Sequence, residues 1–229
     1  MIPKIIHCCW FGGPKTRLAE KCLASWRKYA SGWEIREWSE DELRAAAKDV
    51  GAGTAFFDAA IAAGKWAMAS DWARMVALYA EGGTYLDLDV ELVAPMERLP
   101  DGEWVSGEMT ASGSVWMNPG GGIALGKCSV VAHHMLNAYE SLAFDPKREM
   151  MPWINARLSE TVLTTLDPKV MSPIGMDGRA RITERTVGIH HYAMSWATPR
   201  QRLMQWMSWH GMRWIIDFAL KVRRQWRGR

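Results

Sequence analysis

Two carboxylates separated by one residue, in Asp87-Leu88-Asp89, have the types and spacing that suit metal chemistry. Segment 84–93 alternates apolar and polar residues, which predicts one strand with both acids on the same face, about 7 Å apart. Paired oxygen ligands of this kind suit Mg²⁺ or Mn²⁺ held jointly with a diphosphate. An isolated D-x-D triplet arises by chance about once in such a chain, so alone it indicates only a solvated acidic face.

The residues before this pair add to the pattern. Asp71 and Arg74, at i and i+3, share one face of a helix expected over 65–80, and Gly82-Gly83 ends that helix. A surface ion pair and a helix stop are the ordinary interpretations of these residues. Together with Tyr85 and the acidic pair, however, they form a spaced set that chance does not readily produce.

In three stretches the chain resembles glycosyltransferase family 32, whose members carry a sugar-binding region with a DXD motif. The family includes capsular-polysaccharide enzymes and glucosylating bacterial toxins. The stretches are Ile2-Pro3-Lys4-Ile5-Ile6-His7 with Trp10-Phe11-Gly12-Gly13, the block from Ser70 to Asp89, and His190-His191-Tyr192-Ala193-Met194-Ser195-Trp196. The resemblance implies an α/β fold of the GT-A type, a Rossmann-like mixed sheet flanked by helices. It also implies transfer with retention of anomeric configuration.

The resemblance further implies a role for each matching residue. Asp71 and Arg74 would hold the donor sugar, Asp87 would touch ribose or sugar, and Asp89 would bind the metal directly. The predicted catalytic residues are Asp71, Arg74 and Asp87, and the predicted metal residues are Asp89, Asp87 and His190. Trp10 would stack on the base of the donor. The full set of predicted donor-binding residues is Trp10, Ser70, Tyr85, Asp87, Ser195 and Trp196.

Structural roles stay open for several of these residues. Trp10 and Trp196 could be core anchors, and His190 could be a buried histidine with satisfied hydrogen bonds. The adjacent His191 leaves the choice between the two histidines even, since strand neighbours point to opposite faces. The remaining histidines are interpreted as structural; they are His7, His133, His134 and His210.

The elements expected to position these residues begin with a strand over 4–10, a helix over 16–29, a strand over 33–38 and a helix over 40–49. Ser39 and Glu42 form a capping box at the start of that second helix. This order opens an α/β sheet, in which nucleotides bind beyond the carboxyl ends of the strands. Later segments predict a strand over 115–125, broken around Asn118-Pro119 and three glycines, a helix over 128–142 and a last strand over 187–192.

Composition limits the class of protein. The 229 residues are 48% hydrophobic, enough for one sizeable core, which we expect to span residues 1–199. Four cysteines without C-x-x-C spacing, and no apolar signal segment or run of about 20 apolar residues, predict a reduced, cytoplasmic protein. The four are Cys8, Cys9, Cys22 and Cys128, and the 14 tryptophans suit sugar stacking, membrane interfaces and cores alike.

Residues 200–229 are expected to form a basic amphipathic C-terminal helix. Eight basic residues against one acid give this segment a charge of +7, which leaves −4 of the total +3 for residues 1–199. An apolar stripe at helical spacing comprises Leu203, Met207, Trp214, Phe218 and Val222. Docking on an anionic membrane surface, with the enzyme peripheral on the inner face, and packing of the stripe on the domain are equally compatible with this pattern.

The predicted activity is metal-dependent transfer of a sugar from a nucleotide-sugar, a UDP-sugar, to a saccharide or lipid-linked saccharide, as in capsule synthesis. No nucleic-acid partner is expected. Because no residue can be assigned as nucleophile, same-face attack with the leaving phosphate as base is favoured. One alternative is a non-catalytic binding module, which would not need the paired acids. The other is a nucleotidyl- or phosphotransferase, although the chain lacks the Gly-rich phosphate loop G-x-x-x-x-G-K-[ST].

Overall fold

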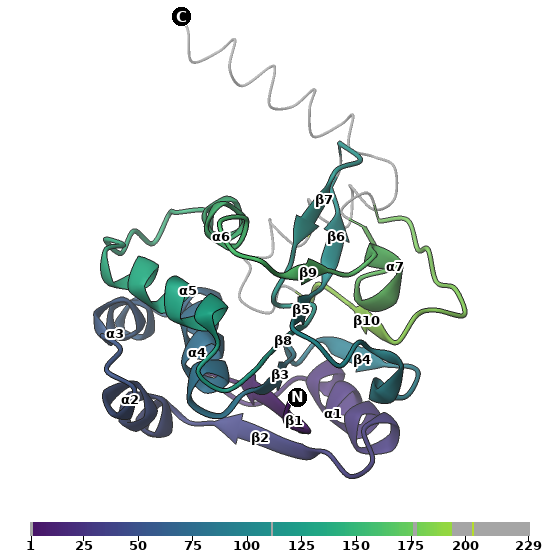
Figure 1. Ribbon diagram of the computed structural model, residues 1–229, viewed down its shortest axis with the longest axis horizontal. Helices are drawn as coiled ribbons and strands as arrows, with labels where there is room; N and C mark the ends of the chain where they lie inside the picture. Colours follow the sequence, from purple (N-terminus) through teal and green to yellow (C-terminus); the bar gives the residue numbers. More distant parts are fainter. Residues whose placement is uncertain (1, 111, 176–177, 194–202, 204–229) are drawn as a thin grey trace, which may run out of the picture.

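The computed structural model describes residues 2–110, 112–175, 178–193 and 203, and the fold within them is α/β (Figure 1). A six-stranded mixed sheet has the order β2-β1-β3-β8-β5-β9, with β9 spanning Thr164–Thr165. Strands β1 (Ile5–Cys9), β2 (Glu34–Trp38) and β3 (Gly83–Tyr85) run parallel, and β8 (Ile123–Leu125) is antiparallel to both β3 and β5 (Trp104–Val105). The mixed sheet expected from the sequence is therefore confirmed.

Two helices near the start of the chain begin directly after capping residues, of which Ser39 was predicted from the sequence. Thr16 accepts a hydrogen bond from the Ala19 N–H at the start of α1 (Arg17–Tyr29). The capping box between Ser39 and Glu42 is formed at α2 (Glu40–Asp49). Helix α3 (Ala55–Ala62), which the sequence analysis did not single out, follows before α4 (Trp66–Glu81), and α4 ends at Gly82 with a φ of 69°.

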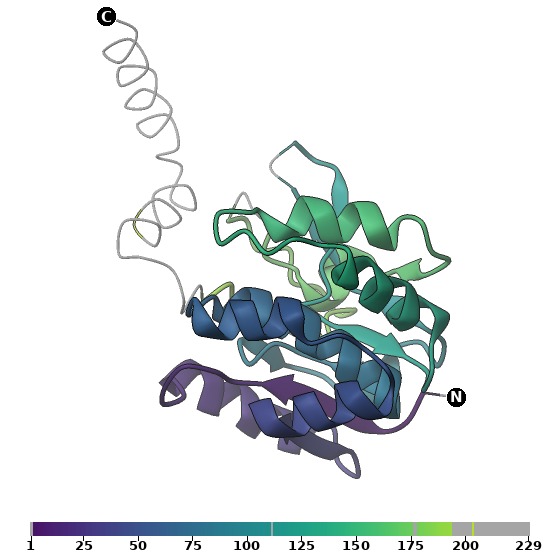
Figure 2. The same cartoon turned by 90° about the vertical axis from the view of Figure 1, so that its left-hand side faces the viewer.

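Helices cover both faces of the sheet, as Figures 1 and 2 show. Helices α2 to α5, with α5 spanning Val130–Glu140, and α6 (Met150–Leu158) contribute to one buried apolar cluster that includes Trp72. Helix α1 and the short α7 (Pro168–Met171) contribute to a second cluster on the other face, around Trp26 and Trp104. Strands β1, β5 and β8 supply buried residues to both clusters by the alternation of their side chains.

The single strand predicted over 84–93 is wrong. The segment forms β3 and β4 (Val90–Leu92), which lie in different sheets, since β4 pairs antiparallel with β10 (Gly188–His190). Between them the Val90 N–H donates to the Asp87 carbonyl at 3.0 Å, closing a turn. The turn keeps Leu86, Leu88, Val90 and Leu92 buried, so apolar alternation alone did not reveal it.

The break predicted around Asn118-Pro119 is present and separates two sheets. Strand β7 (Val115–Met117) forms a hairpin with β6 (Gly107–Met109), while β8 returns to the main sheet. The remaining elements are the 3₁₀ turn η1 (Met96–Arg98) and strand β9 (Thr164–Thr165). None of the helices within the described residues is both long and apolar enough to span a membrane.

Buried His7 joins β1 to the end of α4. Its Nε2 lies 2.7 Å from the Gly82 carbonyl oxygen, and its Nδ1 accepts from the Trp38 indole N–H at 3.0 Å. Burial is the main cause that lowers the pKa of His7 to about 4, so the ring is neutral at pH 7. The contacts are those of a structural histidine that fixes β1 beside β2 and β3.

Candidate active site

A hollow of about 470 Å³ lies at the carboxyl end of β1 and beside the first turns of α4. Three stretches supply its walls: Cys9 to Pro14 together with Thr16, positions from Gly64 to Arg74, and the turn Asp87-Leu88-Asp89; Ala193 lines it as well. The Gly82 helix stop and the parallel strands therefore bring the N-terminal and DXD stretches to one edge of the sheet, where α/β folds bind ligands.

Two partly exposed tryptophans form the apolar end of the hollow. The Trp10 indole N–H donates to the Gly13 carbonyl at 2.9 Å. Trp66, the first residue of α4, lies so close to Gly12 that a Cβ at this position would overlap its indole ring, and Gly12 has a φ of +80°. Trp66 was not predicted, since a tryptophan at a helix start resembles any core anchor in sequence.

Arg74 links two carboxylates in the interior of the site. One of its terminal nitrogens lies 3.0 Å from Asp71 Oδ1 and 3.3 Å from Asp87 Oδ1, and only 3% of the Arg74 side chain is exposed. The surface ion pair considered from the sequence is therefore excluded. Burial raises the pKa of Asp71 to about 6 although Arg74 lowers it, and burial together with Asp89 raises the pKa of Asp87.

The other residues predicted to bind the donor do not all line the hollow. Ser70 lines the hollow. Tyr85 is completely buried beneath the hollow, and its ring centroid lies 5.0 Å from the Arg74 guanidinium. Tyr85 therefore contacts Arg74 through a cation–π interaction. Ser195 and Trp196 lie outside the described residues.

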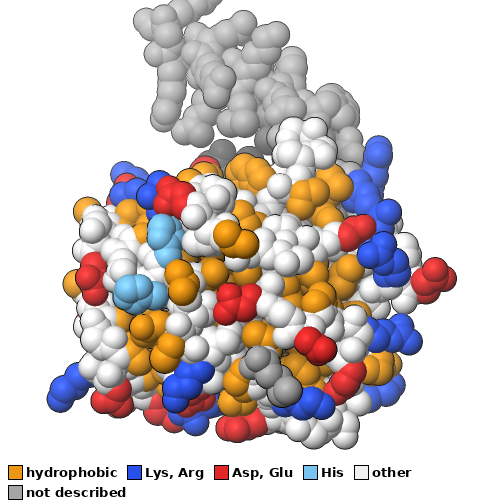
Figure 3. Space-filling view, in the orientation of Figure 1, with side chains coloured by type: hydrophobic (Ala, Val, Ile, Leu, Met, Phe, Trp, Pro, Cys, Tyr) orange, Lys and Arg blue, Asp and Glu red, His pale blue; other side chains and the backbone are white. Residues whose placement is uncertain are grey.

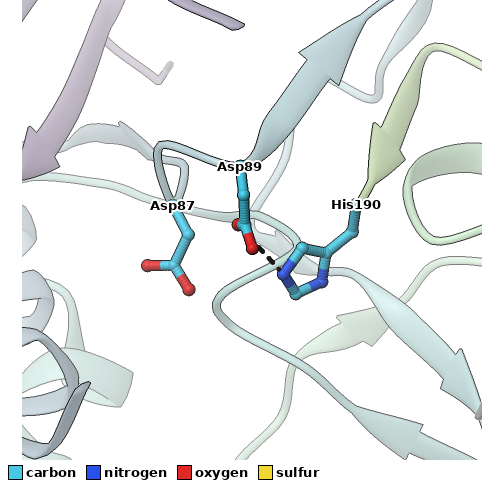
Figure 4. A group of neighbouring side chains, drawn as sticks. All are labelled: Asp87, Asp89 and His190. Atoms are coloured by element: carbon cyan, nitrogen blue, oxygen red, sulfur yellow. Dashed lines mark ion pairs between the residues drawn. The ribbon is translucent and has the colours of Figure 1, made fainter. Parts of the chain in front are cut away.

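Asp87, Asp89 and His190 come together around one point (Figure 4). One ligand atom from each of the three residues lies within 4.8 Å of the others. Both acids belong to the turn that follows β3 and not to the single straight strand expected from the sequence. His190 Nε2 lies 3.2 Å from Asp89 Oδ1.

The charged residues in this group shift one another's pKa values. Asp89 Oδ2 accepts from the Ala193 N–H at 2.8 Å. Burial alone would raise the pKa of Asp89, but the contact with His190 and the Ala193 N–H together hold it below its ordinary value. Burial opposes the charge on His190, yet Asp89, Asp87 and Glu108 raise the pKa of its imidazole.

The pairing of β10 with β4 determines which histidine faces the acids. His190 stands opposite Val90 and is 6% exposed, directed toward Asp89. His191 points the other way, with its Nε2 2.8 Å from Glu91 Oε2, and Lys21 donates to the same oxygen at 2.7 Å. Glu91 is therefore tied to a separate surface pair.

Two buried polar residues beside His190 were missing from the sequence-based site. Asn118 donates from Nδ2 to Glu108 Oε2 at 2.8 Å, and the same Nδ2 lies 3.3 Å from His190 Nδ1. Glu108 belongs to β6 and Asn118 directly follows β7, and both are at most 5% exposed. The interrupting Asn118-Pro119 was the available signal, although it indicated a turn and not a site.

Comparison with known proteins supplements this geometry. Residues 16–106 match a family described as a glycosyltransferase sugar-binding region containing a DXD motif. No curated protein matches the chain. Among solved structures, the PaToxG glycosyltransferase has a TM-score of 0.52 and 21% identity, over 69% of this chain and 69% of that one. A structure of a transferase mutant has a TM-score of 0.42 and 12% identity, over 71% of this chain and 88% of that one. The likeness to PaToxG shows a shared fold.

Proposed function

This chain carries the sugar-binding region of the DXD-containing glycosyltransferases, and from that premise we propose that it transfers a sugar from a UDP-sugar to a hydroxyl group of a saccharide or lipid-linked saccharide. The supporting observation is the composition of one hollow. Its apolar end has two tryptophans for a nucleobase, and its polar end has the buried Asp71–Arg74 pair and the acidic turn. A nucleotide-sugar has the same sequence of aromatic, diphosphate and hydroxyl groups.

The acidic end fits a divalent cation. Asp89 Oδ1 is buried and has no hydrogen-bond partner, because the His190 ring lies close to it without hydrogen-bond alignment. A buried carboxylate oxygen of this kind is costly unless a cation compensates it. Asp89 and Asp87 would hold Mn²⁺ or Mg²⁺, with His190 as the third candidate. When bound, the metal would neutralise charge on the departing diphosphate.

The chain's own residues would orient the donor. Arg74, which stays charged because two carboxylates raise its pKa, would fix the position of Asp71 and Asp87. Asp71, which lines the hollow, would accept hydrogen bonds from sugar hydroxyls. The carboxylates that line the hollow already pair with Arg74 or belong to the proposed metal group. Because these carboxylates are already engaged, none is assigned as a nucleophile opposite the leaving group. This supports retention by attack of the acceptor on the same face of the sugar from which the diphosphate leaves.

A screen of nucleotide-sugars with Mn²⁺, reading nucleoside diphosphate release with and without saccharide acceptors, tests this proposal. Acceptor-dependent release of UDP from one donor is expected. Release of sugar 1-phosphate would indicate a nucleotidyltransferase, and release of nucleoside monophosphate would indicate a phosphotransferase. Binding of a donor without any release would indicate a non-catalytic module. Either of the last two results would contradict the proposal.

A location at the inner face of the cytoplasmic membrane, in capsule or surface-polysaccharide synthesis, is proposed from the sequence of residues 200–229. Of these only Leu203 is among the described residues. The face of the molecule seen in Figure 3 mixes acidic and basic side chains, so this face offers no basic patch for anionic lipid. Flotation with anionic liposomes at low and high salt, comparing the full chain with one ending near Thr198, tests this. An intact protein that stays unbound at low salt would contradict it.

A further inference from the structure

The loop 118–122, between β7 and β8, packs against the acidic turn. Its Gly120 carbonyl accepts from the Asp87 backbone N–H at 3.0 Å. A Cβ on Gly120 would overlap Asp87 Oδ2, so the loop backbone lies directly against that carboxylate. Asn118, at the start of the loop, is the side chain by which the loop reaches His190.

The Asn118 amide can be oriented in only one way. Its Oδ1 accepts from the backbone N–H groups of Gly120 at 3.0 Å and Gly121 at 3.4 Å. Its Nδ2 donates to Glu108 Oε2 at 2.8 Å. Exchanging the oxygen and nitrogen would set the amide N–H₂ against two N–H donors and the amide oxygen against a carboxylate. The group that faces His190 is therefore an N–H donor.

This orientation determines what the His190 ring nitrogens do. Nδ1, 3.3 Å from Asn118 Nδ2, has to accept, so in the neutral ring it carries no proton and the proton is on Nε2. A histidine that binds a metal through Nε2 instead needs an acceptor at Nδ1, where it donates its remaining N–H. The Tyr192 ring, with its centroid 4.0 Å from that of His190, keeps the imidazole in this plane.

We propose that Asn118 is a positioning residue that holds His190 in the tautomer protonated at Nε2, so that the imidazole presents an N–H on the side of Asp89 and not a lone pair to a metal. Metal binding then falls to the two carboxylates. The tautomer follows from the geometry alone, whereas its use beside a diphosphate and a metal rests on the proposed function.

The tautomer can be read directly in the ¹⁵N-labelled, metal-free protein. Long-range ¹H–¹⁵N correlations distinguish the two ring nitrogens, and the His190 signals are those lost in His190→Gln. Spectra taken at increasing pH isolate the neutral ring. We expect the proton on Nε2 in the wild type. A proton on Nδ1 there would overturn the proposal, whatever the outcome of the transfer assays.

A paired substitution tests the role of Asn118. Asn118→Asp replaces the donor by an acceptor, and Glu108→Gln in the same chain supplies an amide N–H to the new carboxylate, which preserves that hydrogen bond. We expect the Nδ1–H signal to replace the Nε2–H signal. Retention of the Nε2–H signal in a folded double variant would contradict control by Asn118, and if the double variant does not fold, the wild-type spectrum still decides the tautomer.

Two controls separate tautomer control from general disturbance. Glu108→Gln alone removes the charge but can still accept from Asn118, so the proton should stay on Nε2. Asn155 is a second amide that bridges backbone groups, accepting from the Met117 N–H at 2.8 Å and donating to the Met117 carbonyl at 2.9 Å. Asn155→Asp should lower stability without moving the His190 proton. A shift of the proton in either control would count against the specific role of Asn118.

Discussion

At the scale of single residues, the carboxylates of the site are used unequally. Asp87 Oδ1 shares the Arg74 guanidinium, whereas Asp89 has one oxygen held by the Ala193 N–H and one buried oxygen without a hydrogen bond. Arg74 compensates Asp87, but no arginine or lysine pairs with Asp89 within the described residues. The proposed metal role therefore depends most on Asp89.

Asp89→Asn should remove metal-dependent transfer from a folded protein. The amide preserves the shape and one oxygen, but it removes the charge that a hard divalent cation requires. We expect a loss of at least about 100-fold in Mn²⁺-dependent turnover, comparable to the loss when one group that stabilises transition-state charge is removed. Circular dichroism serves as the folding control. Substantial Mn²⁺-dependent activity in the variant would refute the assignment of Asp89.

Asp71→Asn should stabilise the metal-free protein while reducing transfer. Burial raises the pKa of Asp71 from 3.8 to about 6. The folded state thus binds this proton more tightly than the unfolded state, and stability is lost as pH rises from about 4 through 6. The variant escapes that loss, which for about two pKa units is at most about 3 kcal/mol.

Urea denaturation of both proteins at pH 4 and pH 8 measures this difference. The variant should be the more stable at pH 8 and nearly equal to the wild type at pH 4. A less stable variant at pH 8 would mean that the pair with Arg74 outweighs the cost of burying the Asp71 carboxylate.

At the scale of elements, the acidic turn and the loop 118–122 hold each other in place. The turn positions both carboxylates, and the loop contacts Asp87 through backbone and His190 through Asn118. Neither segment belongs to a regular strand, yet both follow or precede strands of the main sheet, β3 and β8. The site is therefore built on loops that two paired strands anchor.

Gly120→Ala should disturb the metal group selectively. The added methyl group would overlap Asp87 Oδ2, so either the loop or the carboxylate has to move. We expect a raised Mn²⁺ requirement for transfer, measured as the Mn²⁺ concentration at half-maximal rate. Gly126→Ala, at the other end of β8, is the matched control, since its nearest neighbour would be a Glu103 carboxylate oxygen at an ordinary 3.5 Å. Equal effects of both substitutions would argue against this specific contact.

The regular elements near the start of the chain could be predicted because local signals specify them. Thr16, Ser39 and Gly82 mark helix ends through side-chain or glycine chemistry that depends on neighbours in sequence. The turn at Asp87 to Val90 could not be predicted in the same way. Leu88 and Val90 are buried whether the backbone is straight or turned, so the alternation that indicated a strand carried no information on the turn.

Part of the site was predictable and part was not. Asp71 and Arg74 were placed together by helical spacing, and the D-x-D pair by adjacency. The choice between His190 and His191 required the register of β10 against β4, which joins residues about 100 positions apart. Trp66 and Asn118 were missed because each acts through a partner that lies far away in sequence. Trp66 packs against Gly12 and Asn118 contacts His190, and no local pattern indicates either contact.

At the scale of the whole molecule, the site connects two parts of the fold. The main sheet supplies the acidic turn through β3, the small β4–β10 sheet supplies His190, and the segment after β10 supplies the Ala193 N–H to Asp89. The main sheet separates two apolar clusters, one on each of its faces. A ligand that binds the acidic turn therefore stabilises segments from both halves of the chain.

Binding of metal and nucleotide should stabilise the whole molecule in a coupled manner. A ligand at about 100 times its Kd adds about 2.7 kcal/mol, which in a domain of this size raises the Tm by about 5 to 10 °C. We expect a small rise with Mn²⁺ alone, because the ion offsets repulsion between the partly buried carboxylates of Asp87 and Asp89, and the full rise with Mn²⁺ and UDP together. Differential scanning fluorimetry measures both. Asp89→Asn should show neither the Mn²⁺ rise nor the joint effect, and an equal rise in that variant would place the stabilising ion elsewhere.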